Sequence, residues 1–410
     1  MSEQSRFLDK HTPPHIITLV IVTGAGALNM NIALPSLPGI ATYFGVSYSY
    51  AQLLISAYLA ATAAVQLIIG PLSDRFGRRP VLLACIGIFL VASLVCIFAP
   101  NFQILLVARL VQTVIVAGLV LSRAAVRDMH EPARAASLFG YITMGMAVVP
   151  MVGPAIGGVL DEMFGWQASF LVSLLFGCLA FGLVISDMGE TNKHPSANFA
   201  AQFRAYPELI RSRRFWGYAL SAAFTSGSFF AFLGGAPYVS VTHLGLSPSE
   251  VGFYFALTAV GYMAGNFISG RYTERFGINS MLLSGNVISA LGMVASILTF
   301  AAGSNHPLAF FGYMIFIGFG NGISLPSANA GIVSVRPHLA GSAAGLGGAL
   351  MIGGGAGLSV LSGAVLSPES GAYPILYIML ISAIAGALMA LYVMHVARQV
   401  ALEANEPARQ

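Results

Sequence analysis

The stretch GPLSDRFGRRP, residues 70–80, has a counterpart numbered 200 higher, GRYTERFGINS, residues 270–280. Each stretch opens with glycine, carries an acid at its fifth position and continues with Arg-Phe-Gly. The matching pairs are Gly70 with Gly270, Asp74 with Glu274, Arg75 with Arg275 and Gly77 with Gly277. The chain has 410 residues, so this spacing is close to half its length. A near-repeat at such a spacing predicts a chain built from two similar halves.

The composition is that of a membrane protein. Hydrophobic residues make up 57% of the chain and charged residues only 8%, and the mean hydropathy is +0.80. A soluble domain carries about 25% charged residues, so this chain has too few charges to cover a soluble surface. Apolar runs of about 20 residues, long enough to cross a hydrocarbon core of roughly 30 Å, recur from residue 15 onward. The first run has no small-residue cleavage site, so we expect it to be retained as a helix.

Twelve such runs predict an all-α membrane protein with twelve transmembrane helices in two pseudo-symmetric six-helix bundles. The expected spans are residues 15–36, 49–71, 80–98, 102–126, 135–159, 167–186, 215–239, 249–271, 280–302, 307–333, 342–366 and 372–396. The expected domains are an N-terminal tail (1–14), a first bundle (15–186), a central loop (187–214), a second bundle (215–396) and a C-terminal tail (397–410).

The basic residues predict the orientation in the membrane. Of 19 lysines and arginines, 18 fall on alternate loops of one side: Arg6, Lys10, Arg75, Arg78, Arg79, Arg123, Arg127, Arg134, Lys193, Arg204, Arg211, Arg213, Arg214, Arg271, Arg275, Arg336, Arg398 and Arg409. By the positive-inside rule this side is cytoplasmic, with both termini in the cell. The net charge of +4 is therefore a topology signal, and we expect no nucleic-acid partner.

Corresponding motifs in two parallel six-helix halves are typical of a secondary transporter. The sequence carries no phosphate loop, metal cluster or nucleophile constellation, and its three cysteines (Cys85, Cys96 and Cys178) lie in apolar runs. A glycine-rich run in the span at 342–366 lies inside an apolar helix, where it serves packing. We therefore expect no enzyme activity, no cofactor and no metal.

The quoted stretch, extended to GPLSDRFGRRPVLL, resembles the loop signature of the major facilitator superfamily. Its surroundings, AQLLISAYLAATAAVQLIIGPLSDRFGRRP, MVGPAIGG, GWQASF and FFAFLGGAPYV, resemble the bicyclomycin/chloramphenicol-resistance (Bcr/CflA) group of multidrug efflux transporters. The resemblance implies a major facilitator fold, alternating access, and export of small drugs or metabolites in exchange for protons. It also implies a bacterial inner-membrane location, and we expect a monomer surrounded by lipid bilayer.

The twin motifs are the first candidate gating site. Gly70 and Gly77 permit close helix approach and a tight turn. The charged candidates are Asp74, Arg75, Arg78, Arg79 and Asp128 in the first half, and Glu274 and Arg275, beside Gly277, in the second. One hypothesis is an ion-pair cluster that forms in one conformation and breaks in the other. The alternative is that the arginines only fix the topology.

Arg109 is the one charge expected deep in the membrane, roughly 12 Å past the outer end of its span. A charge there is costly, which makes it a functional candidate. With Gln112 it matches the R-x-x-Q-G signature of the family, although Thr113 replaces the glycine. The resemblance implies substrate binding or proton relay. The alternative is a structural arginine bonded to backbone carbonyls.

The first span departs from the family pattern. Related antiporters carry an acid in a stretch resembling D-M-Y-L-P, whereas this chain reads NIALP, with Asn31 at the acid position. All 15 acids of the chain fall in loops, tails or span ends. Three hypotheses remain open. Proton coupling uses a group near a span end, such as Asp128; or the substrate is an anion whose charge Arg109 balances; or the protein is a uniporter or exchanger. Asn31 is expected to contact substrate opposite Arg109, or else to bond a neighbouring helix.

The fifth span carries the antiporter signature of the family at Gly153, Pro154, Gly157 and Gly158. Pro154 is expected to kink the helix, and the glycines form a small-residue face that another helix can approach. The implied role is a hinge and a seal against leak, alongside tight packing.

Aromatic and polar side chains on other spans are candidate cavity residues. The predicted substrate contacts are Asn31, Tyr58, Arg109, Gln112, Phe230, Tyr238, Tyr254 and Asn321. Aromatic-lined cavities suit flat apolar compounds that a few polar groups orient. The leading functional prediction is export of small amphipathic compounds by proton antiport. The rival is an exporter, uniporter or exchanger of an anionic metabolite or siderophore that uses Arg109.

Overall fold

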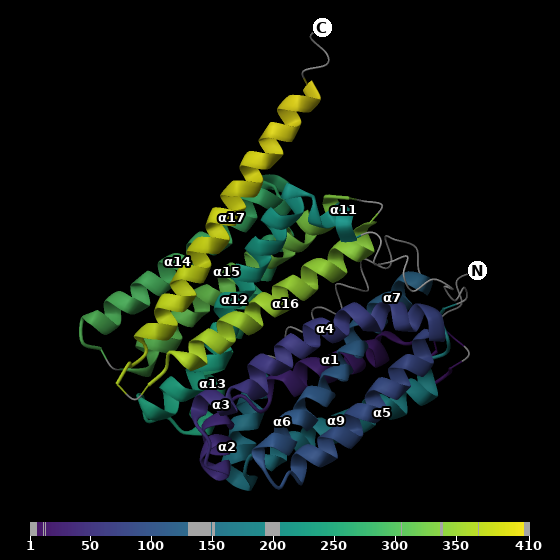
Figure 1. Ribbon diagram of the computed structural model, residues 1–410, viewed down its shortest axis with the longest axis vertical. Coiled ribbons are helices and arrows are strands. Elements are labelled where there is room, and N and C mark those ends of the chain that lie inside the picture. The colour runs from purple at the N-terminus through teal and green to yellow at the C-terminus, as the bar shows by residue number, and fades with distance from the viewer. Residues whose placement is uncertain are drawn as a thin grey trace. The chain divides into compact units, whose positions relative to one another are not determined.

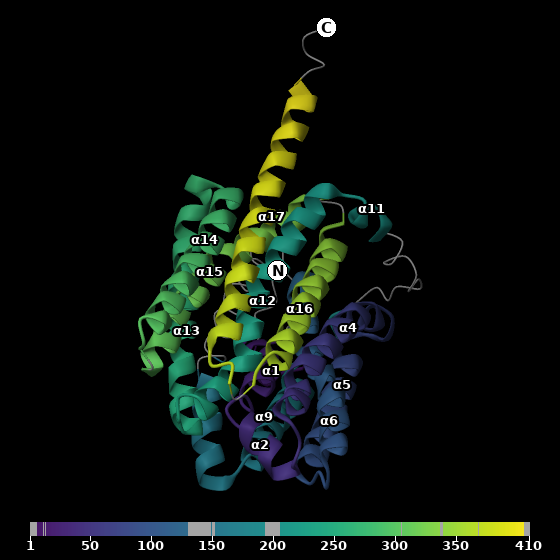
Figure 2. The ribbon, with the colours of Figure 1, turned by 60° about the vertical axis from the view of Figure 1, so that its left-hand side comes forward.

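The computed structural model of the chain describes residues 6–10, 12, 14–129, 149, 152–192, 206–304, 306–336, 339–367 and 369–405. Within these ranges the regular structure is helical (Figures 1 and 2). The structure divides into two units, the first made of Met1–Ala200 with Gly245–Ala256 and the second of Ala201–Leu244 with Leu257–Gln410.

Unit 1 contains the helices of the first half of the chain. They are α1 (Ile16–Asn31), α2 (Leu37–Phe44), α3 (Tyr48–Ala51), α4 (Leu53–Phe76), α5 (Arg78–Ile97), α6 (Phe102–Val111), the 3₁₀ segment η1 (Gln112–Val116), α7 (Ala117–Met129) and α9 (Gln167–Asp187). Residues 152–164 are also helical. Most of the predicted fifth span lies outside the described residues.

Unit 2 contains the helices of the second half. They are α11 (Tyr206–Ile210), α12 (Arg213–Thr242), α13 (Pro248–Phe276), α14 (Ile278–Ala301), α15 (Pro307–Ser334), α16 (Ala340–Ala364) and α17 (Tyr373–Asn405). The start of α13 groups with unit 1 and the rest with unit 2, so this one helix belongs to both. The α17 helix continues to Asn405, beyond the end of the predicted twelfth span.

Ten helices of the described part are long and apolar enough to cross a bilayer, and α1 is a shorter apolar helix. Large apolar side chains on the outward faces, such as Val91, Phe267 and Leu291, are more than 60% exposed. In a bilayer these faces meet lipid tails, so packing between helices depends on close contact rather than on exclusion of water.

Glycines provide that close contact in unit 2. A Cβ atom on Gly318 would overlap the backbone of Thr258, and one on Gly265 would overlap the backbone of Phe319. The backbones of α13 and α15 therefore touch, as small residues in membrane helices allow. In unit 1 a buried core that includes Leu82, Phe89 and Val184 joins α5 to α9.

Two features position the sites described below. Gly77, between α4 and α5, and Gly277, between α13 and α14, have φ angles of 95° and 79°, a region that favours glycine. The repeated motif thus builds the same tight turn in each unit. The second feature is η1, which interrupts the predicted fourth span between α6 and α7 with a more tightly wound segment.

Candidate transport and gating sites

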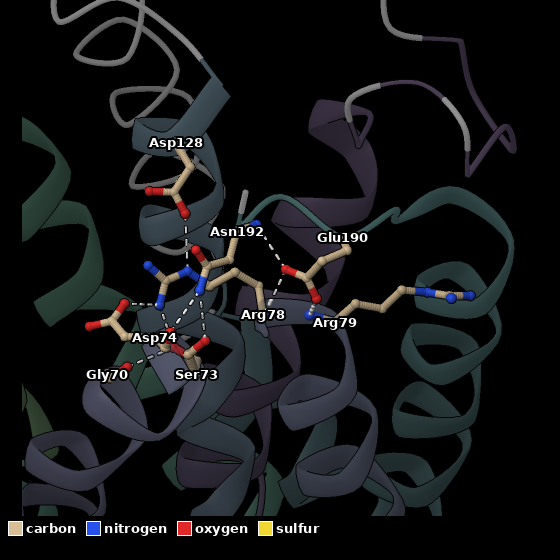
Figure 3. A network of polar contacts seen from close by, with 8 residues as sticks. All are labelled: Gly70, Ser73, Asp74, Arg78, Arg79, Asp128, Glu190 and Asn192. Atoms are coloured by element: carbon tan, nitrogen blue, oxygen red, sulfur yellow. Dashed lines mark hydrogen bonds and ion pairs between the residues drawn. The ribbon is translucent and has the colours of Figure 1, made fainter. Parts of the chain in front are cut away.

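Arg78 is the centre of an ion-pair cluster at the turn between α4 and α5 (Figure 3). Its guanidinium pairs with Asp74, one turn earlier at the end of α4, and donates from Nε to Oδ2 of Asp128 at 3.0 Å. The same group donates to Oγ of Ser73. The Arg78 side chain is only 5% exposed. Because Asp128 lies near the end of α7, this one arginine joins the ends of three helices.

The segment after α9 completes the cluster, and the sequence did not predict it. Glu190 accepts hydrogen bonds from the backbone N–H groups of Arg78 at 2.9 Å and Arg79 at 3.1 Å. Asn192 donates from Nδ2 to the backbone oxygen of Asp74 at 2.9 Å. Glu190 therefore places a negative charge at the positive end of α5, and Asn192 satisfies a carbonyl at the end of α4. An acid shortly after a span, on the side that carries Arg78 and Arg79, is the signal that points to this role.

The second turn lacks this cluster. Ile278 stands where the first turn has Arg78, and Asn279 stands where it has Arg79. Asn279 accepts a hydrogen bond from the hydroxyl of Tyr218 at 2.7 Å. Arg275 lies 5.5 Å from the ring of Phe276. Within the described ranges Glu274 and Arg275 form no ion pair.

Arg109 lies in the interior of unit 1 and is 3% exposed. Its guanidinium donates to the backbone oxygen of Leu54, to both the side-chain and backbone oxygens of Asn29, and to Oε1 of Gln112, at 2.8–3.4 Å. Gln112 in turn donates to Oγ of Ser93 at 2.8 Å. Four hydrogen bonds thus hold the guanidinium, all with neutral oxygens of the chain.

Aromatic rings complete the surroundings of this charge. The guanidinium carbon of Arg109 lies 4.2 Å from the centre of the Tyr58 ring and 5.8 Å from that of Phe170. The Tyr58 hydroxyl accepts a hydrogen bond from Asn29 at 3.2 Å. No carboxylate of the described residues forms an ion pair with Arg109. The positive charge is therefore solvated by dipoles and π faces and is not neutralised.

The partner of Arg109 in α1 is Asn29 and not Asn31. Asn31 donates to the backbone oxygen of Ala27 in its own helix at 2.7 Å. Its Cβ atom lies 3.5 Å from the place a Cβ on Gly153 would take, so Asn31 faces the predicted fifth span. The structure thus brings Tyr58, Arg109 and Gln112 together and places Asn31 on another contact. Asn29, which the sequence analysis did not select, is the residue that fills the expected position.

The antiporter signature makes two kinds of contact. A Cβ atom on Gly157 would overlap the backbone oxygen of Ile32 in the connection after α1, and one on Gly158 would overlap the backbone of Pro248 at the start of α13. A Cβ atom on Gly153 would lie 3.5 Å from its nearest neighbour, which is an ordinary van der Waals distance. Pro154 lies at the same contact, because a Cβ on Gly252 would overlap its carbonyl. Gly157 and Gly158, unlike Gly153, are therefore required for backbone contact.

Two acids follow this signature. Glu162 accepts a hydrogen bond from the backbone N–H of Ser249 at 3.1 Å, at the beginning of α13. That bond lowers the pKa of the Glu162 carboxyl from its usual value. Ser247 and Glu250 form a reciprocal capping box at the same helix end. The start of α13 is thus fixed to unit 1 through hydrogen bonds as well as through glycine packing.

The remaining predicted substrate contacts lie in other places. In unit 2, Phe230 is buried and packs against Gly355, and the ring of Tyr238 lies 5.9 Å from that of His243. Asn321 is 3% exposed, and its Oδ1 atom has no hydrogen-bond partner among the described residues. Tyr254 belongs to the part of α13 that groups with unit 1 and is half-buried.

Unit 2 has its own buried polar cluster, which the sequence analysis did not select. Thr225 donates to Oδ1 of Asn286 at 2.9 Å, and Asn286 donates to Ser324 at 3.4 Å. Ser324 donates to the backbone oxygen of Leu282 at 2.9 Å. All members are neutral, so the interior of unit 2 contains hydrogen-bonded amide and hydroxyl groups where unit 1 contains a charge.

The family model of the Major Facilitator Superfamily matches the chain twice, over residues 19–247 and 229–409. The chain therefore belongs to the major facilitator superfamily. Its predicted all-helical major facilitator fold and its assignment as a multi-pass membrane transporter rather than an enzyme are confirmed.

Relatives with names from drug resistance are similar over most of their length. The chain is 35% identical to the uncharacterized MFS-type transporter YdgK of Bacillus subtilis (strain 168), over 88% of this chain and 91% of that protein. It is 29% identical to a chloramphenicol resistance protein of Pseudomonas aeruginosa, over 85% and 83% of the two chains. It is also 29% identical to multidrug resistance protein D of Escherichia coli (strain K12), over 87% and 89%. These relatives confirm the resemblance to the drug-resistance group.

Among solved structures, the chain resembles a bacterial homolog of the human lysosomal transporter Spinster in an inward-facing, unoccupied conformation. The TM-score is 0.71 over 93% of this chain and 96% of that one, at 18% identity. At this identity the likeness supports the fold alone.

Proposed function

We propose that this transporter exports small amphipathic compounds of the drug type by alternating access, in exchange for protons, from a bacterial inner membrane with both termini in the cytoplasm. The names of the relatives at 29% identity support the substrate class. The alternate placement of 18 of the 19 basic residues supports the orientation.

The contacts of Arg109 support a neutral substrate over an anionic one. Its guanidinium is bound by four oxygens of the chain itself. An anion would have to displace some of these bonds, and each lost bond to a charged group costs about 1.5–3 kcal/mol. We therefore assign Arg109 and Gln112 to the support of the ring of Tyr58, which contacts substrate.

One observation favours the alternative hypothesis, in which the substrate is an anion. The charge of Arg109 has no carboxylate partner among the described residues, so an anion that reached it would gain a strong attraction in a medium of low dielectric constant. The two hypotheses differ in a competition experiment without a pH gradient, because only the rival predicts that small organic carboxylates inhibit exchange at equal pH.

Proton coupling is assigned to Asp128. It is the acid that connects α7, the inner part of the predicted fourth span, to Arg78 at the start of α5. Protonation removes its charge and weakens that ion pair, so a proton at Asp128 favours separation of the two helix ends. Asn31 cannot exchange a proton at neutral pH, which is why the acid of the first span is not available here.

The test is transport by purified protein in lipid vesicles, with labelled chloramphenicol as probe. We expect a pH gradient to raise the rate of accumulation about tenfold in the wild type, a difference of about 1.4 kcal/mol in the barrier. Asp128→Asn is expected to abolish the response to the gradient while chloramphenicol exchange at equal pH continues. Gradient-independent transport by the wild type would contradict proton antiport, and inhibition of chloramphenicol exchange at equal pH by acetate or benzoate would favour the anionic rival.

A further inference from the structure

A groove runs along the outer face of unit 1 between α5 and α6. Eleven residues line it, all apolar except Gln103, and its volume is about 810 Å³. Its floor contains the small buried residues Ala92 and Ala108. Its walls are Val91 and Val107, which are 63% and 60% exposed. The groove is therefore a shallow apolar channel with raised sides.

We propose that the groove is a binding site for one acyl chain of a membrane phospholipid. The α5 helix and the stretch Phe102–Val126, which begins with α6, have the length and hydropathy of membrane spans, so bilayer surrounds this face. An apolar channel offers water no hydrogen-bond partners and does not hold it. The occupant is therefore hydrocarbon.

The lining suits a flexible chain of methylene groups. The helices α5 and α6 are in direct contact, so both contribute side chains to the groove. An acyl chain can enter such a channel and gain dispersion contacts on both sides, which is the attraction that remains within a bilayer.

The polar end of the groove fits the same ligand. Gln103 lies in the first turn of α6, next to the connection with α5. Asn101 already uses its side chain to cap α6, by accepting from the N–H of Ile104 at 2.9 Å. The amide of Gln103 is therefore the group that meets the ester and headgroup region of the lipid.

The site lies on the outer side of the helices that hold Arg109. The lining residues Ala92 and Ala108 immediately precede Ser93 and Arg109 in the chain. Ser93 and Gln112 are joined by a hydrogen bond of 2.8 Å, and Val111 lies at the inner end of the groove, just before η1. A bound acyl chain thus packs against the helices that position the buried charge.

Gly87→Leu tests the proposal without overpacking. No described atom lies within 4 Å of a Cβ at this position, so the larger side chain enters the groove itself. Gly182→Leu on α9 is the matched control, because a Cβ there also meets no described atom within 4 Å and Gly182 does not line this groove. Both variants replace a helical glycine by leucine, so their gains in helix propensity are the same and cancel in the comparison.

The probe is a phosphatidylethanolamine with a photoreactive diazirine on its acyl chain, in vesicles containing the full-length protein. We expect labelling at Val107 and Val111 to exceed that at the exposed Leu175 and Leu179 of α9. Gly87→Leu should lower the labelling at Val107 about fivefold, because a filled channel no longer admits the chain, while Gly182→Leu leaves it unchanged. Val107→Phe, which fills the channel from the other wall, should lower labelling at Val91.

Three results would overturn the proposal. Equal labelling of α6 and α9 would show ordinary boundary lipid. Labelling of the groove that does not change in either filling variant would place the chain elsewhere. Displacement of the label by chloramphenicol at transported concentrations, with no phospholipid retained in native mass spectrometry of the wild type, would assign the groove to the drug.

Discussion

The two turns built by the repeated motif have the same backbone and different chemistry. Gly77 and Gly277 adopt the same positive-φ conformation, and each joins two long membrane helices. In unit 1, Arg78 then pairs with Asp74 and Asp128, and Glu190 caps the helix that follows. In unit 2, Ile278 occupies the equivalent position and Asn279 bonds Tyr218.

The difference separates the backbone turn that the two units share from side chains that they do not. Both turns connect spans over a few residues and both use glycine at positive φ. Among the described residues only the turn of unit 1 carries these ion pairs, and the same unit holds Arg109, whose charge has no carboxylate partner there. The buried cluster of unit 2, by contrast, consists of neutral groups around Asn286. Charge-dependent steps are therefore expected in unit 1, with unit 2 serving as its neutral counterpart.

The largest expected effect is that of Arg109→Met. The change leaves Asn29, Gln112 and the carbonyl of Leu54 without their donor, at a cost of roughly 3 kcal/mol or more in the free energy of unfolding. Thermal unfolding of the detergent-purified protein measures it, and chloramphenicol transport should be lost. Asn286→Ala, the change in the neutral cluster of unit 2, should cost about half as much. Equal losses would show that the two clusters do not differ in the way proposed.

The next effect separates glycines that match in position. Gly157→Ala forces a methyl group against the carbonyl of Ile32 and should destabilise the protein by about 2 kcal/mol. Gly357→Ala, numbered 200 higher in α16, meets no described atom within 4 Å and should be neutral or slightly stabilising. Gly153→Ala has ordinary space and is a second control. Similar unfolding temperatures for all three variants would contradict the backbone contact.

Exchange of the residue that differs between the turns tests the comparison directly. Arg78→Ile gives the first turn the chemistry of the second and removes the pairs with Asp74 and Asp128. We expect a loss of about 1–2 kcal/mol and about a tenfold slower transport. Ile278→Arg adds a charge where the described part of the chain shows no cluster to receive it, and should not restore transport in the double variant. Restored transport in that variant would mean that the position of the charge is unimportant.

The smallest effect concerns the carboxylate that caps α5. Glu190→Gln keeps an acceptor but removes the charge at the helix end, so we expect a loss of about 0.5–1 kcal/mol. Glu208→Gln in unit 2 disrupts an exposed ion pair with Arg336 and should change stability by a few tenths of a kcal/mol, as about 0–1 kcal/mol is typical of such pairs. Denaturant titration of both variants measures the difference. A larger loss for Glu208→Gln would reverse the order proposed for the two units.

The sequence was sufficient for the features that depend on chain-local patterns. The membrane helices of the described residues follow from the apolar runs, the glycine turns from the repeated motif, and the contacts among Asp74, Arg78 and Asp128 from their charges. The sequence was not sufficient to predict contacts that depend on the rotation of a helix about its axis. Asn29 and Asn31 are two residues apart, so they point in nearly opposite directions around α1, and the sequence alone does not show which one meets Arg109. Glu190 lies more than 100 residues from the backbone it caps, and a pairing of this kind is visible only in the fold.

The short 3₁₀ segment in the fourth span has a practical consequence for mapping the pocket. A 3₁₀ helix turns about 120° per residue and an α-helix about 100°. Across the five residues of η1 the difference accumulates to roughly 100°. Side chains of α7 are therefore rotated by that angle around the helix axis, relative to the positions that a continuous α-helix starting at α6 would give them. Cysteine-accessibility scans of this span should therefore show one reactive stripe up to Val111 and another, displaced around the axis by about a quarter turn, from Ala117 onward. A scan interpreted on a single continuous helix would therefore assign some positions of α7 to the wrong face.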